Sequence, residues 1–321
     1  MSDRALASNA DRGIDNAWVC RLALLNCAST VVLIFVGGLV TNTGSALAVP
    51  DWPTTFGYNM FLYPWSKMVG GIFYEHSHRL IGSIVGLLTL TLALLLWFKE
   101  PRRALRWLGA VAIGGVIVQG VLGGLRVVLP SAGGGLAIIH GCLAQAFFAL
   151  TVTLALLTSP GWNQEPQKIM FADSGPLRRL CLLTTGFVYM QIVFGAMLTH
   201  IGSLLYAHLV FAVLVTIHVF LLARRIMRHH PDQSKLMRPV TLLLGLLAVQ
   251  LVLGICSYVA RFTSLAIPYA PLVGLALPTT HRVTGALMLA ACMVLTLRVS
   301  RLLLSQEGIT SRGFIAEQVR A

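Results

Sequence analysis

The chain has 321 residues, of which 56% are hydrophobic and only 11% are charged, with a mean hydropathy of +0.80. A soluble domain carries about 25% charged residues, and a disordered chain needs low hydrophobicity, so both classes are excluded. The net charge of +13 would suggest a nucleic-acid partner for a soluble protein. In a membrane protein, the positions of the positive charges first indicate the orientation of the chain in the membrane. The apolar runs are continuous and do not alternate as in a β-barrel. The sequence therefore predicts an all-α polytopic membrane protein.

A transmembrane helix needs about 20 mostly apolar residues, and eight segments of the chain meet this requirement. In chain order they are residues 22–42, 74–98, 105–128, 136–158, 179–199, 204–223, 240–261 and 280–299. The connecting segments alternate in charge, because those on one side hold 19 of the 24 Lys and Arg residues. Cytoplasmic loops carry such an excess, so both termini are expected to be cytoplasmic. Residues 1–21 contain acids and no apolar run, unlike a transit peptide, and we expect a bacterial cytoplasmic (inner) membrane.

The two halves of the chain resemble each other. Gln119 to Gly123 in the third span matches Gln250 to Gly254 in the seventh. Each half has four spans and starts inside, so the predicted repeat is parallel. We expect two four-helix bundles, residues 22–160 and 179–300, joined by a cytoplasmic linker, 161–178, and flanked by cytoplasmic tails, 1–21 and 301–321.

Four of the nine histidines lie in the first turns of the even-numbered spans: His78, His140, His208 and His281. These spans all run from outside to inside, so the four side chains are expected near the outer face. Ionisable groups inside a membrane are usually functional, and four at one repeated position favour ligation over a structural role. Zinc prefers a compact tetrahedral set, whereas haem takes two histidines from facing helices. The expected pairs are His78 with His140 and His208 with His281.

The predicted external segments contain only two acids, Asp51 and Glu75. Glu75 precedes His78 by three residues and shares its helical face. One interpretation is a helix cap, and the other is a catalytic carboxylate beside one of the two sites. Arg79 and Arg282 directly follow His78 and His281, where an arginine pairs with haem propionates or anchors the helix at the interface. Residues 43–73, rich in proline and aromatic residues, form either a lid over the N-terminal site or an aromatic belt.

Two segments resemble the haem A synthase family: Thr43-Gly44-Ser45-Ala46-Leu47-Ala48-Val49-Pro50-Asp51-Trp52-Pro53 and Glu75-His76-Ser77-His78-Arg79-Leu80-Ile81-Gly82. The resemblance covers about residues 20–300. Several bacterial members have a cysteine pair in the first external loop, whereas residues 43–73 have none, so the chain is closer to the cysteine-free branch.

The resemblance implies two related four-helix bundles and an oxidoreductase that converts haem O to haem A. It oxidises a ring methyl to a formyl group through hydroxylated intermediates. His208 and His281 would hold a haem b cofactor that passes electrons, His78 and His140 the substrate haem O, and Glu75 would be catalytic. Implied partners are an unknown electron donor, haem O synthase, terminal oxidase assembly factors and membrane lipid, with no nucleic acid. The alternative is a membrane haem-binding or electron-transfer protein without haem modification.

Overall fold

The computed structural model describes the backbone of residues 2–163, 174–265 and 269–318, and the side chains of residues 17–162, 175–265 and 269–301. Within these ranges, eight helices are long and apolar enough to cross a membrane. They are α1 (Ser2–Asn42), α2 (Gly71–Lys99), α3 (Arg103–Val128), α4 (Gly133–Leu157), α6 (Ser174–Ile201), α7 (Leu205–His229), α8 (Ser234–Phe262) and α9 (Ala270–Gln318). Shorter helical segments are η1 (Met60–Leu62), η2 (Trp65–Lys67), η3 (Pro130–Ala132) and α5 (Pro160–Asn163). The all-α class and the eight predicted spans are confirmed.

Three predicted non-spanning segments contain more helix than expected. Helix α1 begins at Ser2 and α9 continues to Gln318, so the predicted tails prolong spanning helices. Helices α5 and α6 enter the predicted linker from both sides, and residues 164–173 of that linker lie outside the described residues.

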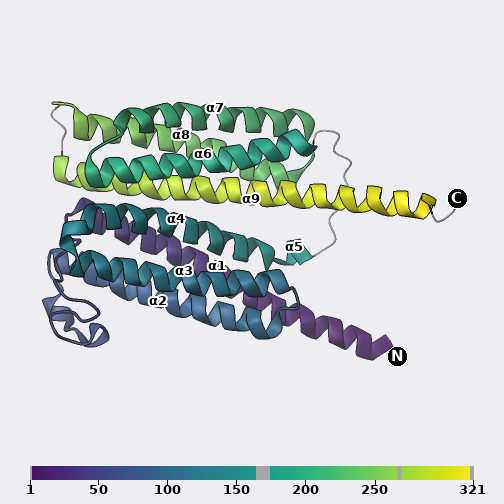
Figure 1. Ribbon diagram of the computed structural model, residues 1–321, viewed down its shortest axis with the longest axis horizontal. Helices are drawn as coiled ribbons and strands as arrows, with labels where there is room; N and C mark the ends of the chain where they lie inside the picture. Colours follow the sequence, from purple (N-terminus) through teal and green to yellow (C-terminus); the bar gives the residue numbers. More distant parts are fainter. Residues whose placement is uncertain (1, 164–173, 266–268, 319–321) are drawn as a thin grey trace.

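The helices form two layers (Figure 1). Helices α1 to α4 make one layer and α6 to α9 make the other, with both chain ends at the same end of the molecule. Helices α1 and α4 of the first layer contact α9 of the second, and α4 also contacts α6. The cytoplasmic position of the termini stays a prediction.

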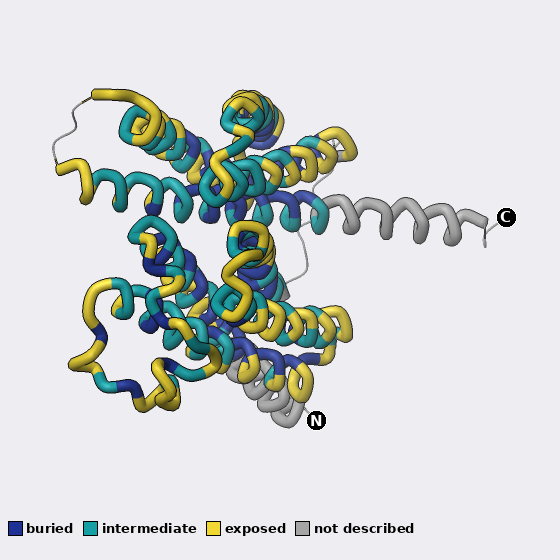
Figure 2. The backbone as a smooth tube through the Cα atoms, turned by 60° about the vertical axis from the view of Figure 1, so that its left-hand side comes forward, coloured by how far each residue is buried: buried dark blue, intermediate teal, exposed yellow. Residues whose placement is uncertain are grey.

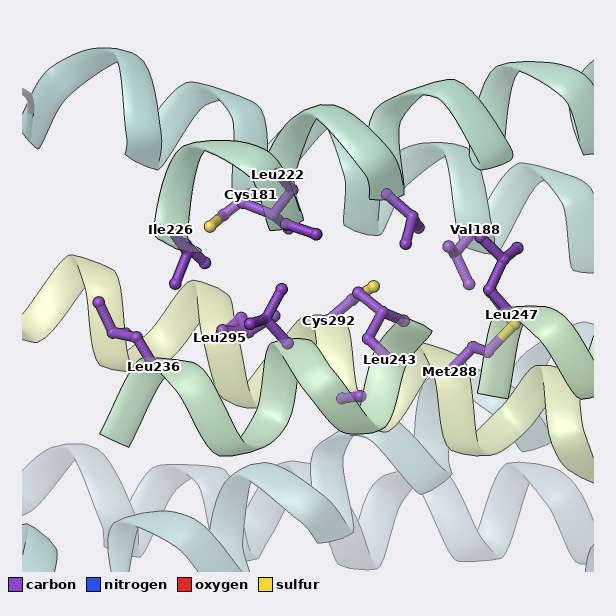
Figure 3. Packing of buried hydrophobic residues seen from close by; sticks show 14 of the residues in the cluster. Cys181, Val188, Leu222, Ile226, Leu236, Leu243, Leu247, Met288, Cys292 and Leu295 are labelled. Carbon is purple, nitrogen blue, oxygen red and sulfur yellow. The ribbon is translucent and has the colours of Figure 1, made fainter. Parts of the chain in front are cut away.

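Each layer has its own apolar core. Buried residues of α6 to α9 pack together around Cys181, Leu222, Leu243 and Leu295 (Figure 3). A matching cluster in α1 to α4 contains Val85, Leu92, Leu96 and Leu154. A third cluster joins the layers through Ile34, Phe148, Val152 and Ala286. Close van der Waals packing of this kind holds helices together in lipid.

Exposed residues recur along the helices (Figure 2). Many of them are large and apolar, such as Leu87, Phe98 and Val252, which are 65%, 77% and 61% exposed. In a water-soluble protein such a surface would be anomalous, but it suits contact with lipid tails. Half of the apolar stretch of α9 is buried, against 17% for α7 and α8. Helix α9 is therefore a helix of the second layer that lies against the first, since it contacts α1 and α4 as well as α6 and α8.

The loop between α1 and α2, residues 43–70, is ordered around Asp51. Its Oδ1 accepts the N–H of Phe56 at 2.7 Å, and its Oδ2 accepts the N–H of Gly57 at 2.9 Å and the hydroxyl of Thr54. Burial works to raise the pKa of Asp51, but these hydrogen bonds outweigh it and hold the pKa below its ordinary value. Ionised Asp51 therefore stabilises the loop at pH values above its unfolded pKa of about 3.9. This stabilisation is lost as the pH falls from about 3.9 through the lower folded pKa.

Candidate functional site

Each of the four predicted ligand histidines lays its ring on a glycine of the helix that precedes it. The pairs are His78 with Gly37, His140 with Gly123, His208 with Gly195 and His281 with Gly254. A Cβ atom on the glycine would stand 3.0 Å from the ring at Gly37, 3.1 Å at Gly195, 3.2 Å at Gly254 and 3.6 Å at Gly123. The absence of a Cβ lets the imidazole lie directly on the neighbouring backbone, so the same cradle occurs four times.

The cradled rings leave their Nδ1 atoms buried without a hydrogen-bond partner, at His78, His140, His208 and His281. The ring centroids of His208 and His281 are 6.4 Å apart. Two imidazoles that bind one metal from opposite sides, with metal–nitrogen bonds of about 2 Å, have ring centres roughly 6 Å apart. The C-terminal pair therefore fits two axial ligands of one haem. His78 and His140 are close enough to interact electrostatically.

Glutamines accompany the C-terminal pair. Gln191 and Gln250 each lie one helical turn before the cradling glycine, with Nε2 atoms 3.2 Å from Nε2 of His208 and His281, respectively. The Oε1 atoms of both glutamines are buried without a partner. Each histidine of this pair thus has a glutamine amide within hydrogen-bonding distance of its Nε2 atom.

The N-terminal pair, His78 and His140, lacks this arrangement of glutamines. Gln119, at the same position of α3, donates to the backbone carbonyl of His140 at 3.2 Å, and α1 has Leu33 where the others have glutamine. His78 is therefore the one histidine of the four whose cradling helix lacks this amide. Sequence reasoning found the glutamines of α3 and α8 as marks of the repeat but missed Gln191, which the same spacing to glycine would have found.

We expect Gly254→Val to lower haem occupancy of the C-terminal pair about tenfold or more, because its Cβ would stand 3.2 Å from the His281 ring and push it out of position. The matched control is Gly245→Val on the same helix, where an added Cβ meets no atom within 4 Å. The measurement is haem bound per purified chain, by pyridine haemochrome absorbance. Equal losses in the two variants would contradict the cradle.

Glu75 is buried and holds the 43–70 loop. Its Oε2 accepts the backbone N–H of Val49 at 2.9 Å, and its Oε1 accepts from Arg79 at 2.8 Å. Arg79 in turn donates to the backbone carbonyls of Val49, Asp51 and Thr54 at 3.2, 2.9 and 3.0 Å. The N–H groups of Arg79 are thus used in hydrogen bonds to Glu75 and to the loop. These contacts do not support the propionate role predicted for Arg79.

Sequence reasoning missed a second anchor of the loop. His76 is 1% exposed, its Nδ1 lies 3.2 Å from the hydroxyl of Thr55, and its ring packs against Tyr63 with centroids 5.1 Å apart. In the motif Glu75-His76-Ser77-His78-Arg79, the first two residues and the arginine therefore bind the loop, and His78 alone of the charged or aromatic side chains packs on α1.

The loop also reaches α3. The indole of Trp52 lies against Gly124, so closely that no Cβ would fit there. Gly124 directly follows Gly123, the glycine that cradles His140. The loop thus covers the backbone next to the N-terminal histidine pair.

Arg282, the second predicted propionate partner, lies where the two layers meet. Its Nη1 donates to the hydroxyl of Thr41 in α1 at 3.3 Å. Nearby, Asn42 donates to Thr279 at 2.9 Å, a second hydrogen bond between the layers. Arg282 makes no ion pair with a carboxylate among the described residues, so its charge is available to a ligand.

Fold and site together define a polytopic membrane protein with two pairs of half-buried, glycine-cradled histidines. The chain belongs to the COX15-CtaA family, described as cytochrome oxidase assembly protein, whose model matches residues 20–207. The matched segment includes Glu75, His78 and His140 and ends just before His208.

Several bacterial proteins named heme A synthase are similar to the chain. The protein of Shouchella clausii is 27% identical over 184 residues, which is 57% of this chain and 56% of that protein. The protein of Staphylococcus haemolyticus is 29% identical over 184 residues, 56% of this chain and 59% of its own. In these two alignments the chain spans little more than half of the relative's length. The protein of Bacillus pumilus is 26% identical over 280 residues, covering 78% of this chain and 88% of its own.

Proposed function

We propose that the chain is a haem A synthase of the bacterial cytoplasmic membrane, which oxidises a ring methyl of haem O to a formyl group through hydroxylated intermediates. The proposal is supported by the family to which the chain belongs and by the name of its relatives. The observation that carries it is the chemical difference between two otherwise repeated histidine pairs, since only the N-terminal pair has a buried carboxylate, Glu75, three residues from a ligand histidine.

In this proposal His208 and His281 hold haem b, which supplies the site with electron transfer when bound. The 6.4 Å spacing of the rings and the two glycine cradles support the assignment. His78 and His140 hold and orient the substrate haem O. The haem sites lie towards the outer face of the membrane.

Dioxygen is the oxidant, and an electron donor of unknown identity supplies electrons. Each hydroxylation places one oxygen atom in a C–H bond of the methyl group and reduces the other oxygen atom to water with two electrons and two protons. Loss of water from the doubly hydroxylated carbon leaves the formyl group.

Glu75 is the proposed catalytic residue. Reduction of one oxygen atom to water takes up protons, and a carboxylate close to the reacting carbon relays them to the site. The N–H of Val49 and the guanidinium of Arg79 fix the position of this carboxylate. Each carboxylate oxygen keeps a further lone pair for a proton. The loop above Glu75 keeps water away from the reacting group, since Trp52 closes it onto α3.

One observation favours a second candidate, a haem-binding or electron-transfer protein that does not modify haem. Both oxygens of Glu75 are already bonded within the protein, as they would be if the residue only anchored the loop. The two candidates differ in whether a new pigment appears.

The test is to produce the chain in cells that make haem O but have no haem A synthase of their own. We expect hydroxylated haem or haem A in pigment extracts, by liquid chromatography with mass spectrometry. Haem O and haem b alone, at normal levels of the protein, would favour the carrier over the enzyme.

A further inference from the structure

A cavity of about 230 Å³ lies where the two helix layers meet, next to the 43–70 loop. We call it the interlayer cavity. Its lining includes Ala46 and Leu47 of the loop, Arg126 of α3, Gly134 and Ala137 of α4, and His200 of α6. The cavity is therefore built from both layers and from the loop that covers the N-terminal pair.

Arg126 places a positive charge at this cavity and has no ion-pair partner among the described residues. Its Nε is buried and makes no hydrogen bond, and no carboxylate of the described residues forms an ion pair with it. Glu75 is near enough to attract Arg126, but its two oxygens are bonded to Val49 and Arg79. An unpaired arginine inside a membrane span costs free energy. An anion bound in the cavity would offset this cost.

Other cationic groups face the same region. Arg282 and His200 are both close enough to Arg126 to interact with it electrostatically. Arg126 belongs to the first layer, whereas Arg282 and His200 belong to the second. The positively charged groups around the cavity thus come from both layers.

The cavity lies beside the N-terminal histidine pair. Ala137, in its wall, precedes His140 by three residues and therefore shares its helical face. Arg126 follows Gly123, the glycine that cradles His140, by three residues. His140 also interacts electrostatically with Arg126. An acidic substituent on a macrocycle held by His140 would thus reach the arginine.

We propose that the interlayer cavity is a carboxylate pocket, in which Arg126, assisted by His200, binds a propionate of the macrocycle held by His78 and His140. The inference rests on the proposed function, because it takes a haem as the ligand of that pair. Arg126 is then a specificity-determining residue that selects macrocycles with free carboxylates. The planar guanidinium suits this role, since it binds a carboxylate through two parallel hydrogen bonds.

The experiment compares haem b with its dimethyl ester, which has no charged propionates. Full-length protein with the haem b that it retains is placed in phosphatidylcholine nanodiscs, and binding of added macrocycle is followed by Soret absorbance. In the wild type we expect tighter binding of the free acid. Arg126→Gln should weaken binding of the free acid about 10- to 100-fold and leave the diester almost unchanged. The control is Arg261→Gln, an exposed arginine near the end of α8 outside the cavity lining.

His200→Gln reports on the same pocket from the other layer, in case Arg126→Gln does not fold. We expect a smaller loss with the same dependence on the free carboxylate. The proposal is overturned if the free acid and the diester are affected equally, or if neither is affected. It is also overturned if Arg126 holds a lipid phosphate instead. In nanodiscs that also contain phosphatidylglycerol, Arg126→Gln would then change the retained lipid, by mass spectrometry, without changing the preference for free acid. A wild type that binds no added macrocycle of either kind would contradict the proposed function itself.

Discussion

Glu75→Gln is expected to lower formation of hydroxylated haem and haem A by at least about 100-fold while haem stays bound. Glutamine has the shape of glutamate and keeps an oxygen that accepts from Val49 or Arg79, so the loop stays anchored. It lacks a carboxylate that can relay protons to the reacting site. The measurement is pigment composition per bound haem, by chromatography with mass spectrometry.

The control must loosen the loop without removing the carboxylate. Thr55→Val removes the hydrogen bond to His76 and leaves the contacts of Glu75 intact. We expect this variant to keep most of the activity. Tryptic cleavage after Lys67, an exposed residue of the loop, reports how far each variant has loosened it. If loss of product follows loosening of the loop in both variants, Glu75 is only an anchor and the catalytic assignment is wrong.

Replacing single histidines of the two pairs should have opposite effects on cofactor and substrate. His281→Ala is expected to remove haem b from the purified protein, with occupancy falling by more than about tenfold. His78→Ala should keep haem b but lose haem O and its oxidation products. The physical reason is that each pair cradles its own rings against its own layer, so loss of one ligand leaves the other pair intact.

His218→Ala is the matched control for these variants. His218 lies on α7, as His208 does, but its Nδ1 lies 2.8 Å from the backbone carbonyl of Leu214 and its ring packs on Phe187. The His218→Ala variant should keep both haems. The measurement is the amount of each haem per chain after extraction. Loss of both haems from His281→Ala and from His78→Ala alike would contradict two independent sites.

Much of this arrangement could be predicted from the sequence, because it follows from periodicity and position. Eight long apolar runs were enough for the eight spans. The repeated place of His78, His140, His208 and His281 at the start of even spans predicted that they act alike, and the structure cradles all four in the same way. Such patterns depend on helix geometry alone.

The partners across space could not be predicted. The sequence marks Gly123 and Gly254 only as part of the repeat, and their contacts with histidine rings of the following helix appear only in the structure. Arg79 bonds to three backbone carbonyls, and a carbonyl has no residue-specific signature. No pattern in the sequence singles out Arg126, because the meeting of α3, α4 and α6 around a cavity depends on tertiary packing.

The most direct test of the central claim is the haem composition of the purified wild-type protein from cells that make haem O. We expect two different haems in each chain, with haem b at His208 and His281 and haem O or an oxidised derivative at His78 and His140. Haem b in both sites, with no haem O, hydroxylated haem or haem A in the extract, would contradict it.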